Sequence, residues 1–121
     1  MNSNELKNRT KKFAIDTWRL CAEIPKTREF DVFCRQLIRC SSSVGANYRA
    51  ACRAKSTADF INKLKIVEEE LDESMYFLEL LEEMSPNEKI KTLLNEANQL
   101  LSIFVASINT SKKSLQSVPQ S

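Results

Sequence analysis

The chain has 121 residues, enough for one domain, and its 42% hydrophobic and 28% charged residues are ordinary for a globular protein. One glycine and no histidine exclude the glycine-rich phosphate-binding loops and the usual general base of enzymes at neutral pH. The net charge is only +2, yet residues 1–55 hold 12 Lys and Arg against 5 Asp and Glu, whereas residues 56–121 hold 6 against 11.

The first predicted helix covers residues 4–24. Apolar side chains recur near helical spacing from Leu6 to Ile24, with basic residues at the positions between them. Pro25 cannot continue the helix, because it lacks the backbone N–H that a helix interior requires. A short connection is therefore expected after residue 24.

The second predicted helix covers residues 31–54, with Asp31 at its positively polarised start. Its middle contains a run of small residues around Gly45, the only glycine of the chain. A glycine inside a helix costs about 1 kcal/mol relative to alanine. The run therefore predicts that another helix passes unusually close at Gly45.

The third and fourth predicted helices cover residues 57–84 and 86–110. The third follows the capping pattern Ser56-Thr57-Ala58-Asp59, and its apolar residues alternate in steps of three and four. The fourth is expected to begin at Ser85-Pro86-Asn87-Glu88, with Ser85 as its cap and Pro86 in the first turn. The polar tail, residues 111–121, is expected to be flexible.

Four helices of similar length with short connections favour a single all-α domain, an antiparallel up-down-up-down four-helix bundle. No apolar run reaches the roughly 20 residues that a membrane helix needs, so no membrane association is expected. The four cysteines show no zinc-site spacing and lie in mostly apolar segments. We interpret them as core or near-core residues of a reduced, cytoplasmic protein.

The sequence shows no arrangement of residues that is typical of a catalytic or metal site. The acidic residues concentrate on the third helix, whereas a di-metal bundle would draw Glu from several helices together with His. We expect no catalytic residues, no metal and no cofactor, and hence no enzyme activity.

One central segment carries a family resemblance. The run Ser43-Val44-Gly45-Ala46-Asn47-Tyr48-Arg49-Ala50-Ala51, with the segments at 59–64 and 70–81, resembles a signature of the small four-helix-bundle proteins first noticed inside intervening sequences of bacterial 23S rRNA genes. The resemblance covers about residues 10–110. Many members carry Glu just after the Tyr48-Arg49 position, where this chain has Ala50-Ala51.

The resemblance implies a four-helix bundle that assembles as a ring-like homopentamer, in a family whose biochemical role is not settled. Distantly related proteins are accessory factors of the reverse transcriptases of diversity-generating retroelements. In those proteins a basic surface of the pentamer contacts nucleic acid and the enzyme. A nucleic-acid role comes to this chain only by analogy.

A basic cluster on the second helix is the candidate site. Arg35 and Arg53 are 18 residues apart, which is five full turns, so they point the same way. The expected nucleic-acid-binding residues are Arg35, Arg39, Arg49, Arg53, Lys55 and Lys63.

Two alternatives stay open. The arginines of this cluster can instead pair with carboxylates such as Glu68, Glu70 and Glu73, within one subunit or between subunits. The chain can also be a structural scaffold that docks a partner protein and has no nucleic-acid role.

Overall fold

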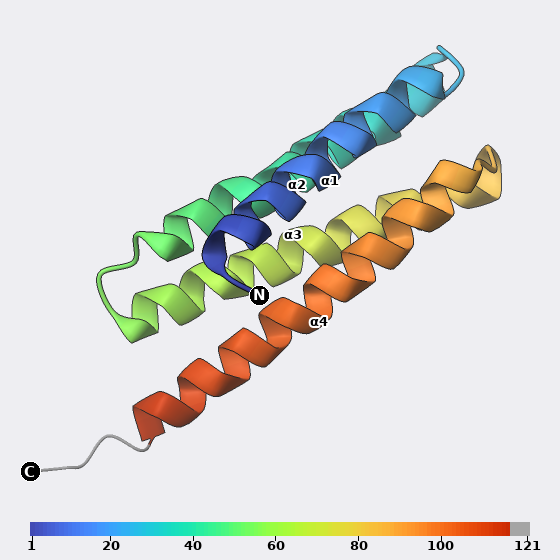
Figure 1. Ribbon diagram of the computed structural model, residues 1–121. Coiled ribbons are helices and arrows are strands. Elements are labelled where there is room, and N and C mark those ends of the chain that lie inside the picture. Colours follow the sequence, from blue (N-terminus) through green and yellow to red (C-terminus); the bar gives the residue numbers. More distant parts are fainter. Residues whose placement is uncertain (117–121) are drawn as a thin grey trace, which may run out of the picture.

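Four α-helices make up the computed structural model, which describes residues 1–116 of the chain. They are α1 (Ser3–Glu23), α2 (Arg28–Cys52), α3 (Thr57–Met84) and α4 (Glu88–Gln116). Figure 1 shows long rods that alternate in direction and are joined by short connections. Helix α2 packs between α1 and α3, α3 also packs against α4, and α1 with α4 forms the weakest seam. The predicted all-α antiparallel four-helix bundle is confirmed.

The first three helices begin after a polar side chain that accepts a hydrogen bond from the backbone N–H three residues on. These capping residues are Asn2, Thr27 and Ser56. The bounds of α3 agree with the prediction. Helix α2 begins at residue 28 and not 31, because Thr27 caps it upstream of Asp31, and it ends at residue 52 and not 54.

The predicted start of α4 was wrong by two residues. Ser85 closes α3 instead, because its backbone N–H donates to the carbonyl of Leu81 at 2.7 Å. The first turn of α4 is served by Asn87, whose side-chain oxygen accepts a hydrogen bond from the backbone N–H of Lys89 at 2.9 Å.

The predicted end of α4 at residue 110 was also wrong, because the helix continues to Gln116. Neither glycine nor proline interrupts this stretch, and Ser111 and Ser114 line a hollow beside the connection between α2 and α3. The last part of the predicted tail, residues 117–121, lies outside the described residues.

The core is a continuous column of apolar side chains from all four helices. Among the described residues, no helix is long and apolar enough to cross a bilayer. Across the core, the rings of Tyr48 and Phe104 contact each other with centroids 5.2 Å apart. Full burial of each large apolar side chain stabilises the fold by about 1.5–3 kcal/mol. The largest completely buried side chains include Phe13, Leu20, Leu37, Leu64, Leu71, Leu78, Leu81, Ile90, Leu100 and Phe104.

The close approach predicted at Gly45 is confirmed. A Cβ atom built on Gly45 would lie only 3.1 Å from the side-chain oxygen of Thr10 on α1. Thr10 is fully buried, and its hydroxyl donates to the carbonyl of Leu6 at 2.8 Å. Any side chain at residue 45 would therefore press on a hydroxyl that is already held in place.

The four cysteines are free thiols in different environments. Cys21 and Cys40 are buried as expected and Cys34 is half-buried, but the near-core interpretation was wrong for Cys52, which is exposed. Burial is the main cause that raises the pKa of Cys21 to about 12. Cys52 is exposed because it occupies the last helical residue of α2, where the chain leaves the core for the connection to α3.

Candidate nucleic-acid interface

Most of the predicted cationic residues lie on the outer surface of the bundle. Arg35, Arg49 and Arg53 are exposed on α2, opposite its buried stripe, and Lys55 is exposed in the connection between α2 and α3. Lys63 is half-buried on α3. None of these five side chains has a carboxylate partner within residues 1–116, so their charges are free in the single chain.

Arg39 is the exception in the predicted set. Its guanidinium contacts the carboxylates of Glu73 at 2.5 Å and Glu70 at 3.5 Å, and its Nε donates to Gln36 at 3.2 Å. The hydrogen bond to Glu73 is the main cause that raises the pKa of Arg39. Arg39 therefore joins α2 to α3, and the pairing alternative holds for this one arginine within the single chain.

Glu70 lies on the inner side of this ion pair. Its side chain is only 17% exposed, and its Oε2 has no hydrogen-bond partner among the described residues. Burial is the main cause that raises the pKa of Glu70, and neighbouring Glu73 adds to the rise, while Arg39 opposes it. The carboxyl group is thus held partly against its preference for water.

We expect the stability contributed by Glu70 to fall as the pH rises. The pKa of Glu70 is higher in the folded state than the ordinary value of 4.5. Between these two pKa values the folded protein therefore binds more protons than the unfolded protein. The stabilisation from Glu70 is complete below the ordinary pKa, and it is lost as the pH rises through the higher pKa of the folded state. Urea unfolding from about pH 4 to about pH 7 measures it.

Two substitutions separate Glu70 from other titrating groups. In Glu70→Gln this part of the pH dependence should disappear, so wild type should lose stability relative to the variant as the pH rises. In Arg39→Gln the decline should extend to higher pH, because the cation that lowers the pKa of Glu70 is gone. Parallel pH profiles for wild type and Glu70→Gln would contradict the assignment.

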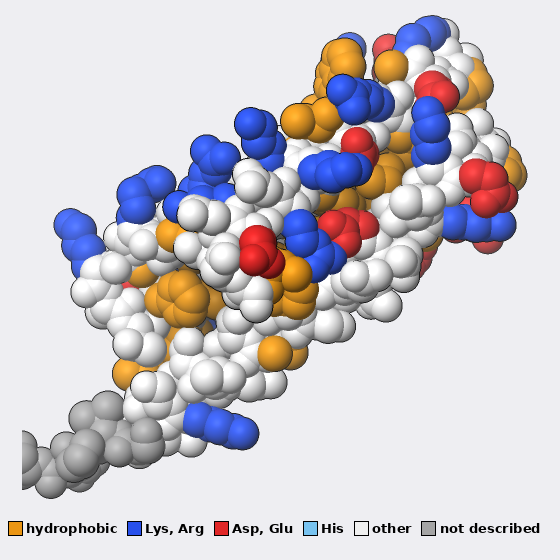
Figure 2. Space-filling view, viewed as in Figure 1, with side chains coloured by type: hydrophobic (Ala, Val, Ile, Leu, Met, Phe, Trp, Pro, Cys, Tyr) orange, Lys and Arg blue, Asp and Glu red, His pale blue; other side chains and the backbone are white. Residues whose placement is uncertain are grey.

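Two free cations of α1 also belong to the basic surface, and sequence reasoning missed them. Lys7 and Lys11, one turn apart, line a groove of about 420 Å³ between α1 and α2, with Arg49 on the opposite wall. Small residues of α2 form its floor, where Gly45 lets α1 approach. Figure 2 shows Lys and Arg side chains in a row along the edge formed by α1 and α2. We define the α1–α2 groove by Lys7, Lys11 and Arg49. Its remaining lining residues are Thr10, Ala14, Ile15, Ser42, Gly45 and Ala46.

Several other cations of α1 and α4 form ion pairs, unlike Lys7 and Lys11. Arg9 forms an ion pair with Glu96 of α4 and also contacts Gln99 at 3.3 Å. Lys12 pairs with Asp16 on the same helix. Across the weak seam, Lys89 of α4 contacts a carboxylate of α1, that of Glu23, at 2.7 Å.

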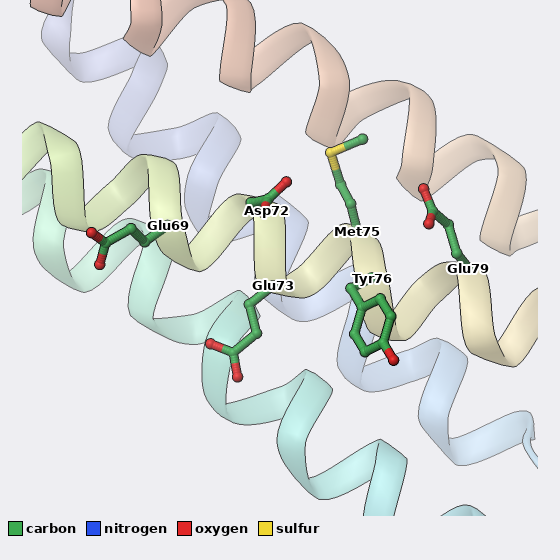
Figure 3. Close-up of a pocket in the computed structure, with 6 residues that line it drawn as sticks. All are labelled: Glu69, Asp72, Glu73, Met75, Tyr76 and Glu79. Carbon is green, nitrogen blue, oxygen red and sulfur yellow. The ribbon is translucent and has the colours of Figure 1, made fainter.

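The outer surface of α3 is acidic. Glu69, Asp72 and Glu79 line a hollow of about 470 Å³ together with Met75 and Tyr76, and Figure 3 shows these side chains projecting from one helix. Unlike Glu73, which also lines the hollow, the other three carboxylates have no cationic partner within residues 1–116. In that part of the chain, no group of three Asp, Glu or Cys side chains is placed to hold a metal ion. We call Glu69, Asp72, Met75, Tyr76 and Glu79 the α3 acidic face.

Comparisons with known proteins identify related chains. The family model described as "23S rRNA-intervening sequence protein" matches residues 2–106. A crystal structure of a protein with unknown function from the S23 ribosomal protein family of Bacteroides thetaiotaomicron shares 32% sequence identity, with a TM-score of 0.81. The alignment covers 90% of this chain and 99% of that one. No curated protein matches the chain.

Proposed function

The chain belongs to the family of 23S rRNA-intervening sequence proteins, and we propose that it is a non-enzymatic, oligomeric helical bundle that binds the backbone of RNA or DNA. The observation that supports this proposal is a set of exposed or half-buried cations on α2, the following connection and α3 that have no carboxylate partner within residues 1–116. Arg9, Lys12 and Lys89, by contrast, are held in ion pairs. The surface that we assign to nucleic acid consists of Arg35, Arg49, Arg53, Lys55 and Lys63.

The chemistry of this surface favours phosphate over bases. Long cationic side chains bind phosphate oxygens, whereas readout of single-stranded bases usually uses aromatic platforms beside the cations. The exposed aromatic side chains of the described residues, Trp18 and Tyr76, are not among the residues assigned to nucleic acid. Binding should therefore depend strongly on salt and only weakly on sequence.

Assembly would multiply the weak contacts of one subunit. We propose a homo-oligomer, with five subunits taken from the family resemblance, in which each copy adds the same cations along one strand. Linked sites of this kind raise the overall affinity without any new type of contact. A cytoplasmic location is part of the proposal, and the four free thiols support it.

A scaffold that docks a partner protein is the second candidate function. The observation that favours it is the exposure of large apolar side chains: Trp18 is 59% exposed and Val32 is 55% exposed. Exposed large apolar side chains that gather in one patch mark surfaces that contact protein, and an aromatic side chain such as Trp18 is the type enriched in such contacts. This candidate predicts no nucleic-acid binding.

The experiment that tests the proposal is salt-titrated binding to single- and double-stranded RNA and DNA. Each cation that contacts a phosphate should add about 0.9 to the slope of log affinity against log salt on duplex DNA. Triple substitution Arg53→Gln, Lys55→Gln, Lys63→Gln should therefore weaken binding and reduce the slope by about one for each phosphate that is no longer bound. Fluorescence anisotropy with labelled strands measures both quantities.

The matched control removes three charges that are paired. Lys12→Gln, Lys89→Gln and Lys91→Gln change the net charge equally, but these lysines contact Asp16, Glu23 and Glu88 in the folded chain. The control should bind nearly as well as wild type. Absence of binding by the intact oligomer at low salt, or equally weakened binding in both triple variants, would contradict the proposal.

A further inference from the structure

Two of the four cysteines face each other across the seam between α1 and α2. Cys21 lies in the last turn of α1, and Cys34 lies near the start of α2. The Sγ of Cys21 is 4.0 Å from the backbone carbonyl oxygen of Cys34. The side chain of Cys21 therefore reaches the backbone of the neighbouring helix, close to the short connection between the two helices (Figure 1).

The register of α1 against α2 explains this contact. Gly45 marks one facing pair of residues, because Thr10 lies directly against it. In antiparallel helices, equal steps in opposite directions along the two chains lead to the next facing pair. Cys21 lies 11 residues after Thr10. Cys34 lies 11 residues before Gly45. Since about 11 residues make three turns, both cysteines return to the same close seam.

The two thiols also interact with each other. Burial is the largest cause that raises the pKa of Cys21 to about 12, and the thiol of Cys34 adds to this rise through its charge and a hydrogen bond. At neutral pH Cys21 therefore stays protonated. Cys21 is only 6% exposed, whereas Cys34 is half-buried. A small reagent in solvent thus reaches the sulfur of Cys34 first.

We propose that Cys21 and Cys34 are an oxidisable pair that closes to a disulfide between α1 and α2 when the protein meets hydrogen peroxide. This modification site is independent of nucleic-acid binding and of the number of subunits. In a reducing compartment the two thiols stay free, in agreement with the proposed cytoplasmic location, and the bond forms only on exposure to the oxidant.

The reaction takes two steps, and each step releases one water molecule. The sulfur of Cys34 attacks one peroxide oxygen, the O–O bond breaks, and Cys34 becomes a sulfenic acid while the second oxygen leaves as water. The sulfur of Cys21 then attacks the sulfur of Cys34. The S–S bond forms, the S–O bond breaks, and the hydroxyl group leaves as water with the proton of Cys21. Two thiols together give up two electrons and two protons, and the peroxide is reduced to water.

The other two cysteines are poorly placed to replace Cys21 as the partner of Cys34. Cys40 is completely buried, and the hydroxyl of Ser74 donates a hydrogen bond to its sulfur at 3.2 Å. Cys52 is exposed, but it lies at the other end of α2, about 27 Å from Cys34 along the helix axis. Within one chain, Cys21 is therefore the sulfur that meets an oxidised Cys34.

The test is mild oxidation of the folded chain with hydrogen peroxide, followed by peptide mapping without reduction. The protein carries Cys52→Ser, so that exposed thiols of two copies cannot join. Trypsin places Cys21 on the peptide 20–26 and Cys34 on the peptide 29–35, apart from Cys40. These two peptides should appear linked, and the intact chain should be lighter by two hydrogens. Dithiothreitol should reverse both changes.

Thermal unfolding gives a second measurement, which oxidation of unrelated groups would not move in the same way. The bond closes a loop with 12 residues between the two cysteines, so the oxidised protein should unfold at a temperature several degrees higher than the reduced protein. The matched control adds Cys34→Ser, which keeps the buried thiols of Cys21 and Cys40. Peroxide should neither link its peptides nor raise its midpoint.

A further variant separates the two steps. With Cys21→Ser the sulfenic acid of Cys34 has no thiol to meet, so dimedone, which reacts with sulfenic acids, should label the peptide 29–35. The label should be much weaker when Cys21 is present. Peptides that stay unlinked, linkage of a different pair, or a midpoint that is unchanged or lower after oxidation would each overturn the proposal.

Discussion

Replacing Phe104 by alanine should lower the free energy of unfolding by about 3–5 kcal/mol. Phe104 is completely buried on α4, and its ring contacts Tyr48 of α2 across the core. The substitution removes apolar packing and leaves a cavity that the long, straight helices cannot easily close. For a domain whose whole stability is of the order of 5–15 kcal/mol, this decrease is a large fraction.

Urea unfolding followed by circular dichroism measures this effect, with Leu115→Ala as the control on the same helix. Leu115 is 46% exposed, so its truncation should change stability by less than about 0.5 kcal/mol. The midpoint for Phe104→Ala should therefore fall well below that of the control. Equal midpoints would contradict the burial of Phe104 and its contact with Tyr48 across the core.

Replacing Gly45 by leucine should cost about 1–3 kcal/mol by overpacking. Even the first carbon of the new side chain would lie 3.1 Å from the hydroxyl oxygen of Thr10, which is fully buried and cannot move into solvent. Leucine is a better helix former than glycine by nearly 1 kcal/mol, so the measured decrease in stability is what remains after that gain.

The control for this substitution is Ala46→Leu, one residue further along α2. Ala46 is exposed and lines the same groove, so leucine there also fills the groove but meets no buried side chain. Thermal unfolding should show a lower midpoint for Gly45→Leu and little change for Ala46→Leu. Unchanged stability of Gly45→Leu would contradict the close approach of the helices.

The sequence was sufficient for the fold because its signals are local and agree with one another. Regular apolar spacing, the cap at Ser56 and the stop at Pro25 each act within a few residues, and together they define four helices. The errors occurred at helix ends, where Thr27, Ser85 and Asn87 all offer plausible caps. Which of them is used depends on how the connections pack, and a linear pattern does not contain that information.

The candidate site could be predicted only in part, for a similar reason. Helical spacing places Arg35 and Arg53 on the exposed side of α2, and the structure agrees. It cannot say that Arg39 meets Glu70 and Glu73, since that depends on the rotation and register of α3 against α2. Helical spacing also could not show that Lys7 and Lys11 of α1 lie beside Arg49 of α2.

One available signal was overlooked in this region. Lys7 and Lys11 are one turn apart on a helix whose partner carries the only glycine, which already marked a close contact. Had the close partner of α2 been identified as α1, these lysines would have joined the predicted cluster. The structure supplies that identification through the contact between Gly45 and Thr10.

The exposed thiol of Cys52 gives this protein a natural attachment point for a spectroscopic reporter. Cys21 and Cys40 are buried and Cys34 is half-covered, so a neutral dye that alkylates thiols should label Cys52 first. The dye would then sit next to Arg53 and three residues from Lys55. Strands arriving at these cations would change its emission, with no engineered cysteine.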